Sequence, residues 1–114
     1  GHGLDEARTD MLEGRWLVAS EHLERHTGDT FESPAIQAAF HFALGSCYRF
    51  DAMRGEPNAA AQFQRAIESF ERAAELQPRS VRYINALSAT RENLSDHGVL
   101  QRQLQTLGQH RTPL

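Results

Sequence analysis

The histidines, the acids and the one cysteine are the residues of this chain that could do chemistry. His22 and His26 stand one helical turn apart, as two metal ligands on one helix face would, and Glu21 and Glu24 lie beside them. A zinc site takes three or four ligands, and the sequence offers no evident third. We expect surface histidines here, with no bound metal and no cofactor; a metal-dependent activity at this pair is the alternative.

Cys47 is the only cysteine. A nucleophilic thiol needs a base within reach and a lowered pKa, and no histidine lies one turn from Cys47 in the sequence. We expect it to be a core residue. Neither a glycine-rich phosphate loop nor a Ser-His-Asp arrangement nor a pair of buried carboxylates can be identified. The sequence therefore predicts that this segment is not an enzyme.

Composition excludes several classes of partner. The chain has 12 basic residues, all of them arginine, and 15 acidic ones, for a net charge of −3. It lacks the clustered positive charge that neutralises phosphates, so we expect no nucleic acid. No apolar run approaches the ~20 residues of a membrane span, so we expect no membrane insertion. A lone cysteine allows no internal disulfide, which favours a cytoplasmic location.

Proline and glycine divide the chain into segments with helical periodicity, and the alternating β-branched runs typical of strands are missing. The sequence predicts an all-α fold of about six helices in three antiparallel hairpins. We expect one domain over residues 4–109, preceded by a tag remnant or disordered start at 1–3 and followed by a tail at 110–114. The expected hairpins cover residues 4–26, 34–77 and 80–108.

Serine or aspartate residues are expected to cap the N-termini of the two helices of the third hairpin. Ser80 can cap a helix that runs to about Leu94, and Ser95 or Asp96 can cap another that ends near Gly108.

A recurring pattern of small, aromatic and aliphatic residues points to a repeat. Its first instance is Ala66-x3-Phe70-x2-Ala73-x2-Leu76-x-Pro78, and Leu100-x3-Leu104-x2-Leu107 follows 34 residues later. The first instance resembles the second helix of a tetratricopeptide repeat, whose period is also 34 residues. His41-x2-Leu44-Gly45-x2-Tyr48 resembles the first-helix signature W-x2-L-G-x2-Y, with histidine at the tryptophan position. Ile84-x2-Leu87-Ser88-x2-Arg91 echoes it more faintly.

One departure from the family concerns the middle hairpin. Tyr48 and Ala66 are eighteen residues apart, whereas the corresponding positions of the family are nine residues apart, as Arg91 and Leu100 are here. The simplest account lengthens both helices of this hairpin by about a turn each, so that it projects beyond its neighbours. In the same hairpin the resemblance implies close helix packing at Gly45, Ala66 and Ala73.

The resemblance implies a short right-handed α-solenoid whose first helices line a concave groove for a partner. Phe42 and Phe50 would offer apolar contact, and Arg49 and Arg82 would hold a carboxylate or backbone. The partner-binding residues it implies are Phe42, Ser46, Arg49, Phe50, Arg82, Asn85 and Glu92. In the alternative interpretation the two aromatics belong to the core and the arginines only solvate the surface.

We therefore expect a non-catalytic protein-protein interaction module, a scaffold that binds a peptide or partner helix, within a larger bacterial protein. The partner is expected to be a protein or peptide, and a homo-oligomer is possible. The alternatives are a self-associating structural or assembly domain and a small secretion-type chaperone.

Overall fold

The computed structural model describes residues 1–55 and 57–110, with the backbone alone at 109 and 110. The expected tail therefore lies outside the described residues, apart from the backbone of residue 110. The helices are α1 (Leu4–Leu12), α2 (Trp16–Glu24), α3 (Pro34–Met53), α4 (Ala59–Leu76) and α5 (Val81–His110). The described ranges contain no strand, which confirms the all-α class. No helix within them has both the length and the apolar character needed to cross a bilayer.

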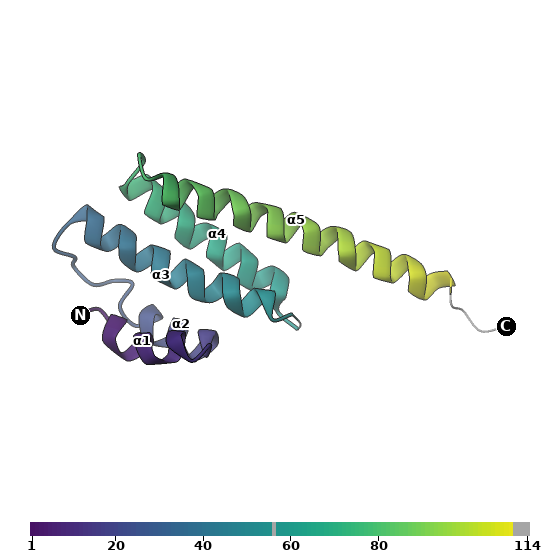
Figure 1. Ribbon diagram of the computed structural model, residues 1–114, viewed down its shortest axis with the longest axis horizontal. Helices are drawn as coiled ribbons and strands as arrows, with labels where there is room; N and C mark the ends of the chain where they lie inside the picture. The colour runs from purple at the N-terminus through teal and green to yellow at the C-terminus, as the bar shows by residue number, and fades with distance from the viewer. Residues whose placement is uncertain (56, 111–114) are drawn as a thin grey trace.

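The helices pack as neighbours in chain order. Figure 1 shows the short α1–α2 hairpin against one side of α3, with α4 and then α5 on the other side. Ser33 begins α3 by accepting a hydrogen bond from the Ile36 N–H at 3.2 Å, and Pro34 occupies its first turn. Because α3 has neighbours on two sides, it is buried on several faces, as its nearly continuous apolar sequence predicts.

The core lies where α3 meets α4 and the first hairpin. Phe40, Phe70 and Leu23 are its largest fully buried side chains. Ala66 and Ala73 are completely buried on the inner face of α4, between larger residues. These small residues allow α4 to lie close to its neighbours.

Gly45 marks the closest approach of α3 and α4. A Cβ atom at this position would lie 2.8 Å from two ring carbons of Phe70 and 3.1 Å from the Cβ of Ser69. Neither neighbour is the free end of a flexible chain, because Phe70 is itself buried in the core. The glycine is therefore required by packing.

The middle hairpin has the long helices that the sequence predicts. α3 has 20 residues and α4 has 18, whereas α1 and α2 have 9 each. The α3–α4 connection accordingly lies beyond the end of the first hairpin in Figure 1.

The third hairpin is not present in the described residues, and five helices stand where about six were expected. α5 is a single helix of 30 residues that continues through Ser95 and Asp96, the residues expected to cap a sixth helix. A cap forms only where the chain leaves the helix before it, and no proline stands between residues 81 and 110. Gly98 costs only about 1 kcal/mol in a helix interior, which is too little to end the helix.

The continuous helix gives the molecule its length. The structure measures 65 × 29 × 21 Å, and its radius of gyration is 16.5 Å. A compact chain of this size would have a radius of gyration of about 13 Å. Figure 1 shows the cause, because α5 continues well past the start of α4.

We predict that alanine lowers the stability of the protein at Gly45 but not at Gly98. Gly45→Ala places a methyl group against Phe70 and should lower the free energy of unfolding by about 1–3 kcal/mol. Gly98→Ala is the control, because a Cβ there meets only Arg102 Nη1 at 3.5 Å. The control should be neutral or stabilising by up to about 1 kcal/mol. Urea unfolding measures the free energy of unfolding of both variants. An equal change in this free energy for Gly45→Ala and Gly98→Ala would contradict the packing role of Gly45.

Candidate protein-binding groove

A groove opens between the first hairpin, α3 and the start of α5. It encloses a volume of about 450 Å³, and its exposed lining is mainly apolar. The lining side chains are Met11, Leu12, Trp16, Phe42, Ser46, Arg49, Phe50, Phe70, Arg82 and Ala86. All five helices contribute, so the groove exists only in the folded molecule.

Aromatic rings form much of its wall. The ring centroids of Trp16 and Phe50 are 4.8 Å apart, which joins α2 to the C-terminal part of α3. The ring of Phe42 lies 5.5 Å from that of Phe70 and 5.2 Å from that of Tyr83. These tilted contacts hold the rings in place, so a ligand would meet a largely preformed surface.

Two guanidinium groups stand beside these rings. The Cζ atom of Arg82 lies 4.5 Å from the centroid of the Phe42 ring, which is a cation–π contact. Arg49 donates from Nε to Oδ1 of Asn93 at 2.8 Å, a bond that ties α3 to α5. Within residues 1–55 and 57–110, neither arginine forms an ion pair with a carboxylate. Their charges therefore face the groove without a described acidic partner.

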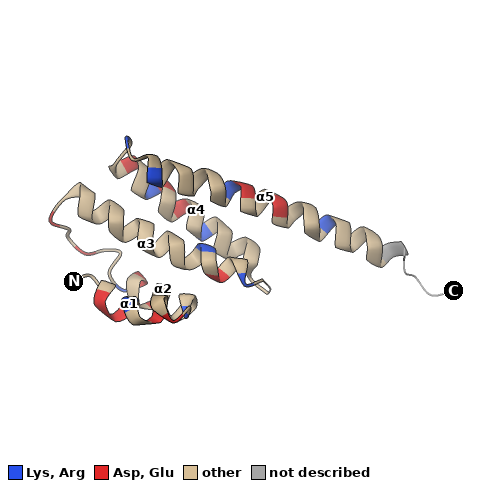
Figure 2. Ribbon diagram, viewed as in Figure 1, with Lys and Arg blue, Asp and Glu red and all other residues tan. Residues whose placement is uncertain are grey.

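Charged residues are sparse along α3, which supplies four of the lining residues of the groove. Figure 2 shows α3 in tan until its C-terminal part, where a blue turn and a red turn occur. The acid there is Asp51, whose carboxylate accepts from Nε2 of Gln62 at 2.9 Å, on the α4 side. Apolar walls around the arginines reduce the screening of their charge by water.

Five of the seven residues that the sequence predicts for partner binding line this one groove: Phe42, Ser46, Arg49, Phe50 and Arg82. Asn85 and Glu92 are exposed on α5 and are not part of its lining. The Ser46 hydroxyl donates to the Phe42 carbonyl at 2.8 Å, so its proton is already used within α3.

The sequence left open whether Phe42 and Phe50 belong to the core or to the binding surface. In the structure each ring packs against a neighbouring ring and also borders the groove. Phe42 is half-buried and packs against the core through Phe70, yet it also borders the groove. Phe50 is 39% exposed and contacts Trp16. Each ring is therefore supported on one side and accessible on the other.

Sequence reasoning missed the wall that the first hairpin supplies. Met11, Leu12 and Trp16 reach the groove because α1 and α2 pack across α3, which no local pattern reveals. One signal was available: Leu12 directly follows another apolar residue, Met11, at the end of α1, and the structure leaves Leu12 82% exposed. Phe70, which belongs to the repeat pattern, also borders the groove, as does Ala86 on α5.

The histidines proposed as metal ligands have separate acidic partners. His22 Nε2 lies 3.3 Å from Oδ2 of Asp10, a buried acid that also pairs with Arg15 at 2.7 Å. His26 Nδ1 lies 2.8 Å from Oδ2 of Asp29. The part of the chain that the structure describes contains no group of three or more His, Cys, Asp or Glu side chains able to hold a metal.

His2 joins this surface to the start of the chain. Its Nδ1 lies 2.9 Å from Oδ2 of Asp29, and its ring packs 4.3 Å from that of Phe31. The contact with Asp29 raises the pKa of His2. Hydrogen bonds with His2 and His26 lower the pKa of Asp29. The cluster is an electrostatic tie between the segment that joins α2 to α3 and the N-terminal residues.

Cys47 is a core thiol, as the sequence predicts. It is completely buried, and burial raises its pKa from 9.0 to about 12. A thiol held neutral in this way is a poor nucleophile. Its neighbour Tyr48 donates from its hydroxyl to the Glu24 carboxylate, and burial followed by this bond raises the pKa of the phenol.

We predict a loss of stability at alkaline pH that begins with Cys47. The folded state keeps the thiol protonated, whereas the unfolded chain loses the proton above pH ~9. The unfolded state then binds fewer protons, so the free energy of unfolding falls by up to about 1.4 kcal/mol per pH unit as pH rises toward 12. The chain has no lysine, so few other groups titrate between pH 9 and 10.

The measurement is urea unfolding at half-unit steps from pH 7 to 10.5. Cys47→Ala should lower stability at pH 7 by about 1 kcal/mol and flatten the slope between pH 9 and 10. Tyr48→Phe, the matched variant, should keep that slope and reduce the fall only above pH 10. An unchanged slope in Cys47→Ala would refute the assignment to the thiol.

Comparisons with known proteins identify no relative of this chain. No protein-family model matches the chain, and no curated protein or solved structure matches it. Function must therefore be argued from the side chains of the groove.

Proposed function

We propose that this chain is a non-catalytic binding module that holds a peptide or partner helix in the groove. The observation that carries the proposal is the pairing of Arg49 and Arg82 with an aromatic wall, where neither arginine has a described carboxylate partner. Guanidinium groups bind carboxylates with two parallel hydrogen bonds. Beside an apolar surface, they select a segment that presents an acid next to a hydrophobic residue.

The size of the groove favours one or two anchoring side chains. A volume of about 450 Å³ falls within the range of ligand pockets and accommodates an aromatic or branched aliphatic residue. Binding energy at interfaces concentrates on such anchors in desolvated pockets. Phe50 and Leu12, both exposed at the rim, would be covered by the rest of the partner segment.

We also propose that the scaffold is a short tetratricopeptide-like solenoid made of two hairpins and α5. The positions that the family keeps small are Gly45, Ala66 and Ala73, and in this chain they lie where α3 and α4 approach each other. The lining of the groove supports the proposal, because most of it comes from α1, α3 and α5, the helices that would be first in each repeat of such a solenoid. The proposal needs no third hairpin, because α5 supplies the wall that closes the groove.

The test begins with a display library of 16-residue helical peptides selected on the immobilised full chain. We expect the selected peptides to share an acidic residue within one turn of an aromatic or leucine. A fluorescent synthetic copy then titrates the wild-type chain. Arg49→Ala and Arg82→Ala should each weaken binding about tenfold or more, and raised salt should weaken the wild-type complex.

Arg25→Ala is the matched control, because Arg25 is exposed at the end of α2 and does not line the groove. It should bind the peptide as the wild type does. Far-UV circular dichroism shows whether each variant keeps its helices. Selected peptides that bind Arg49→Ala and Arg82→Ala as tightly as the control would overturn the proposal.

A further inference from the structure

The second half of α5 carries leucines that are half exposed among the residues the structure describes. We call residues 99–110 the α5 extension, which Figure 1 shows running past the start of α4. Leu100 and Leu104 are each 52% exposed and Leu107 is 54% exposed. A run of exposed leucines on one helix marks an interaction surface, because water contact with each is unfavourable.

The spacing of these leucines is that of a helix-pairing seam. Steps of four and then three residues place Leu100, Leu104 and Leu107 in one stripe. Followed back along α5, the same 4-and-3 spacing reaches His97 and Asn93, and these two border the α3 and α4 side. The stripe therefore continues the face by which α5 packs on its own chain.

The internal repeat shows that the residues equivalent to these leucines are buried where a neighbouring helix is present. Leu100, Leu104 and Leu107 follow Ala66, Phe70 and Ala73 by 34 residues each. The earlier three are 0%, 1% and 0% exposed, because α4 packs against a neighbouring helix there. The later three have residues of the same apolar kind, but no described helix of this chain covers them. A helix from outside the chain would complete the packing.

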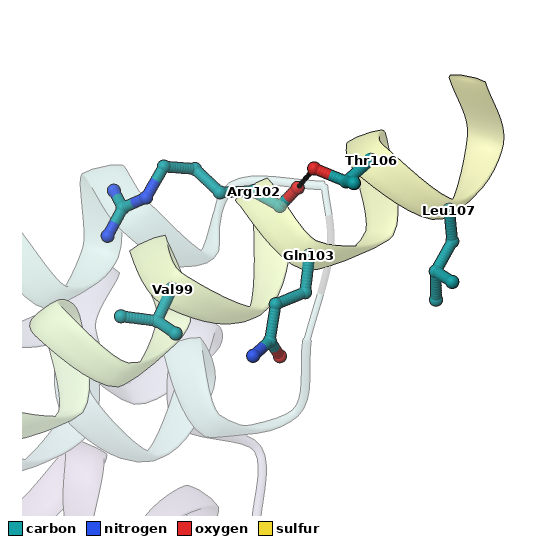
Figure 3. A pocket seen from close by; sticks show the side chains of 5 residues that line it. All are labelled: Val99, Arg102, Gln103, Thr106 and Leu107. Carbon is teal, nitrogen blue, oxygen red and sulfur yellow. Dashed lines mark hydrogen bonds between the residues drawn. The ribbon is translucent and has the colours of Figure 1, made fainter. Parts of the chain in front are cut away.

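The charged residues of the α5 extension indicate which outside helix would cover the leucine stripe. No aspartate or glutamate follows Asp96, and Arg102 is the only arginine of the extension. Figure 3 shows Arg102 and Thr106 on one side of the helix, with Val99, Gln103 and Leu107 projecting from the other. A stripe flanked by glutamine offers no charge for a charged partner to match. A second, identical stripe meets it without repulsion between like charges.

We propose that the α5 extension pairs antiparallel with the α5 extension of a second copy of this chain. In this arrangement the end of each extension lies near the partner's Leu100. A cleft of about 350 Å³ adjoins that leucine and is bordered by Met53, Phe63 and His97. Met53 is 55% exposed at this site. The second copy thus covers Met53 together with the leucines.

The dimer is expected to be weak. Twelve helical residues span about 18 Å, so two extensions bury less than the roughly 800 Å² per partner of a standard interface. We expect a dissociation constant on the order of micromolar or higher, visible only at raised concentration. The groove lies at the other end of α5, so peptide binding and pairing are independent.

Sedimentation equilibrium of the full chain from about 5 μM to 1 mM tests the proposal. The wild type should shift from monomer to dimer across this range. Leu104→Glu should weaken dimerisation at least about thirtyfold, because it buries a charge in the centre of the stripe. Gln105→Glu adds the same charge at the next residue, off the stripe, and should dimerise within about threefold of wild type.

Leu104→Gln is a second variant without a charge, and circular dichroism checks that every variant keeps its helices. Leu104→Gln should also weaken the dimer. Arg49→Ala should dimerise normally, which separates this surface from the groove. A wild type that stays monomeric at 1 mM would overturn the proposal, as would equal dimerisation of Leu104→Glu and Gln105→Glu.

Discussion

The contact between Gly45 and the ring of Phe70 is the constraint on which the rest of the structure depends. It brings α3 and α4 close enough for the aromatic ring to lie on the α3 backbone, which leaves no room for a methyl group. The centroid of the same ring lies 5.5 Å from that of Phe42, which is one turn before Gly45 on α3. Phe70 thus takes part both in this close packing and in the floor of the groove. A change in the spacing of α3 and α4 would therefore disturb both the contact between Gly45 and Phe70 and the floor of the groove.

The polar groups of the groove depend on this rigid floor. Arg82 reaches across from α5 and lies over Phe42, and Arg49 is held by Asn93. Both positive charges are thus positioned by neutral partners, so no described intramolecular acid competes with a bound carboxylate. Because the two side chains are positioned before binding, they would lose less conformational entropy when a carboxylate binds. This arrangement is typical of a recognition site rather than of a salt bridge that stabilises the fold.

Helix α5 connects two surfaces of different character. Its first turns close the groove and carry a positive charge, whereas its last turns carry an uncharged leucine stripe. Leu104 is 22 residues beyond Arg82, which corresponds to about 33 Å along a helix. At this separation the proposed partner in the groove and the proposed second copy on the extension would not compete for space. The length of α5 makes the two surfaces separate.

Local patterns in the sequence determined the all-α class, the start of α3 at Ser33 and Pro34, the long middle hairpin and the buried thiol of Cys47. Most of these follow from nearest-neighbour chemistry or from helical periodicity. The length of the middle hairpin followed instead from its departure from the tetratricopeptide spacing. Five of the seven predicted binding residues proved to share a groove because they recur along one face of α3 or begin α5. Asn85 and Glu92 did not line it, because small rotations about α5 decide which residues face inward.

Only the tertiary structure decided that α5 is one helix and that the first hairpin forms a wall of the groove. Ser95 and Asp96 fit either a cap or a helix interior, since the cost of placing them inside a helix is below about 1 kcal/mol. Packing of Leu94 and His97 near Phe63 favours continuation at that point. Trp16 and Leu12 reach the groove through contacts between segments more than twenty residues apart, and such contacts leave no local trace in a sequence.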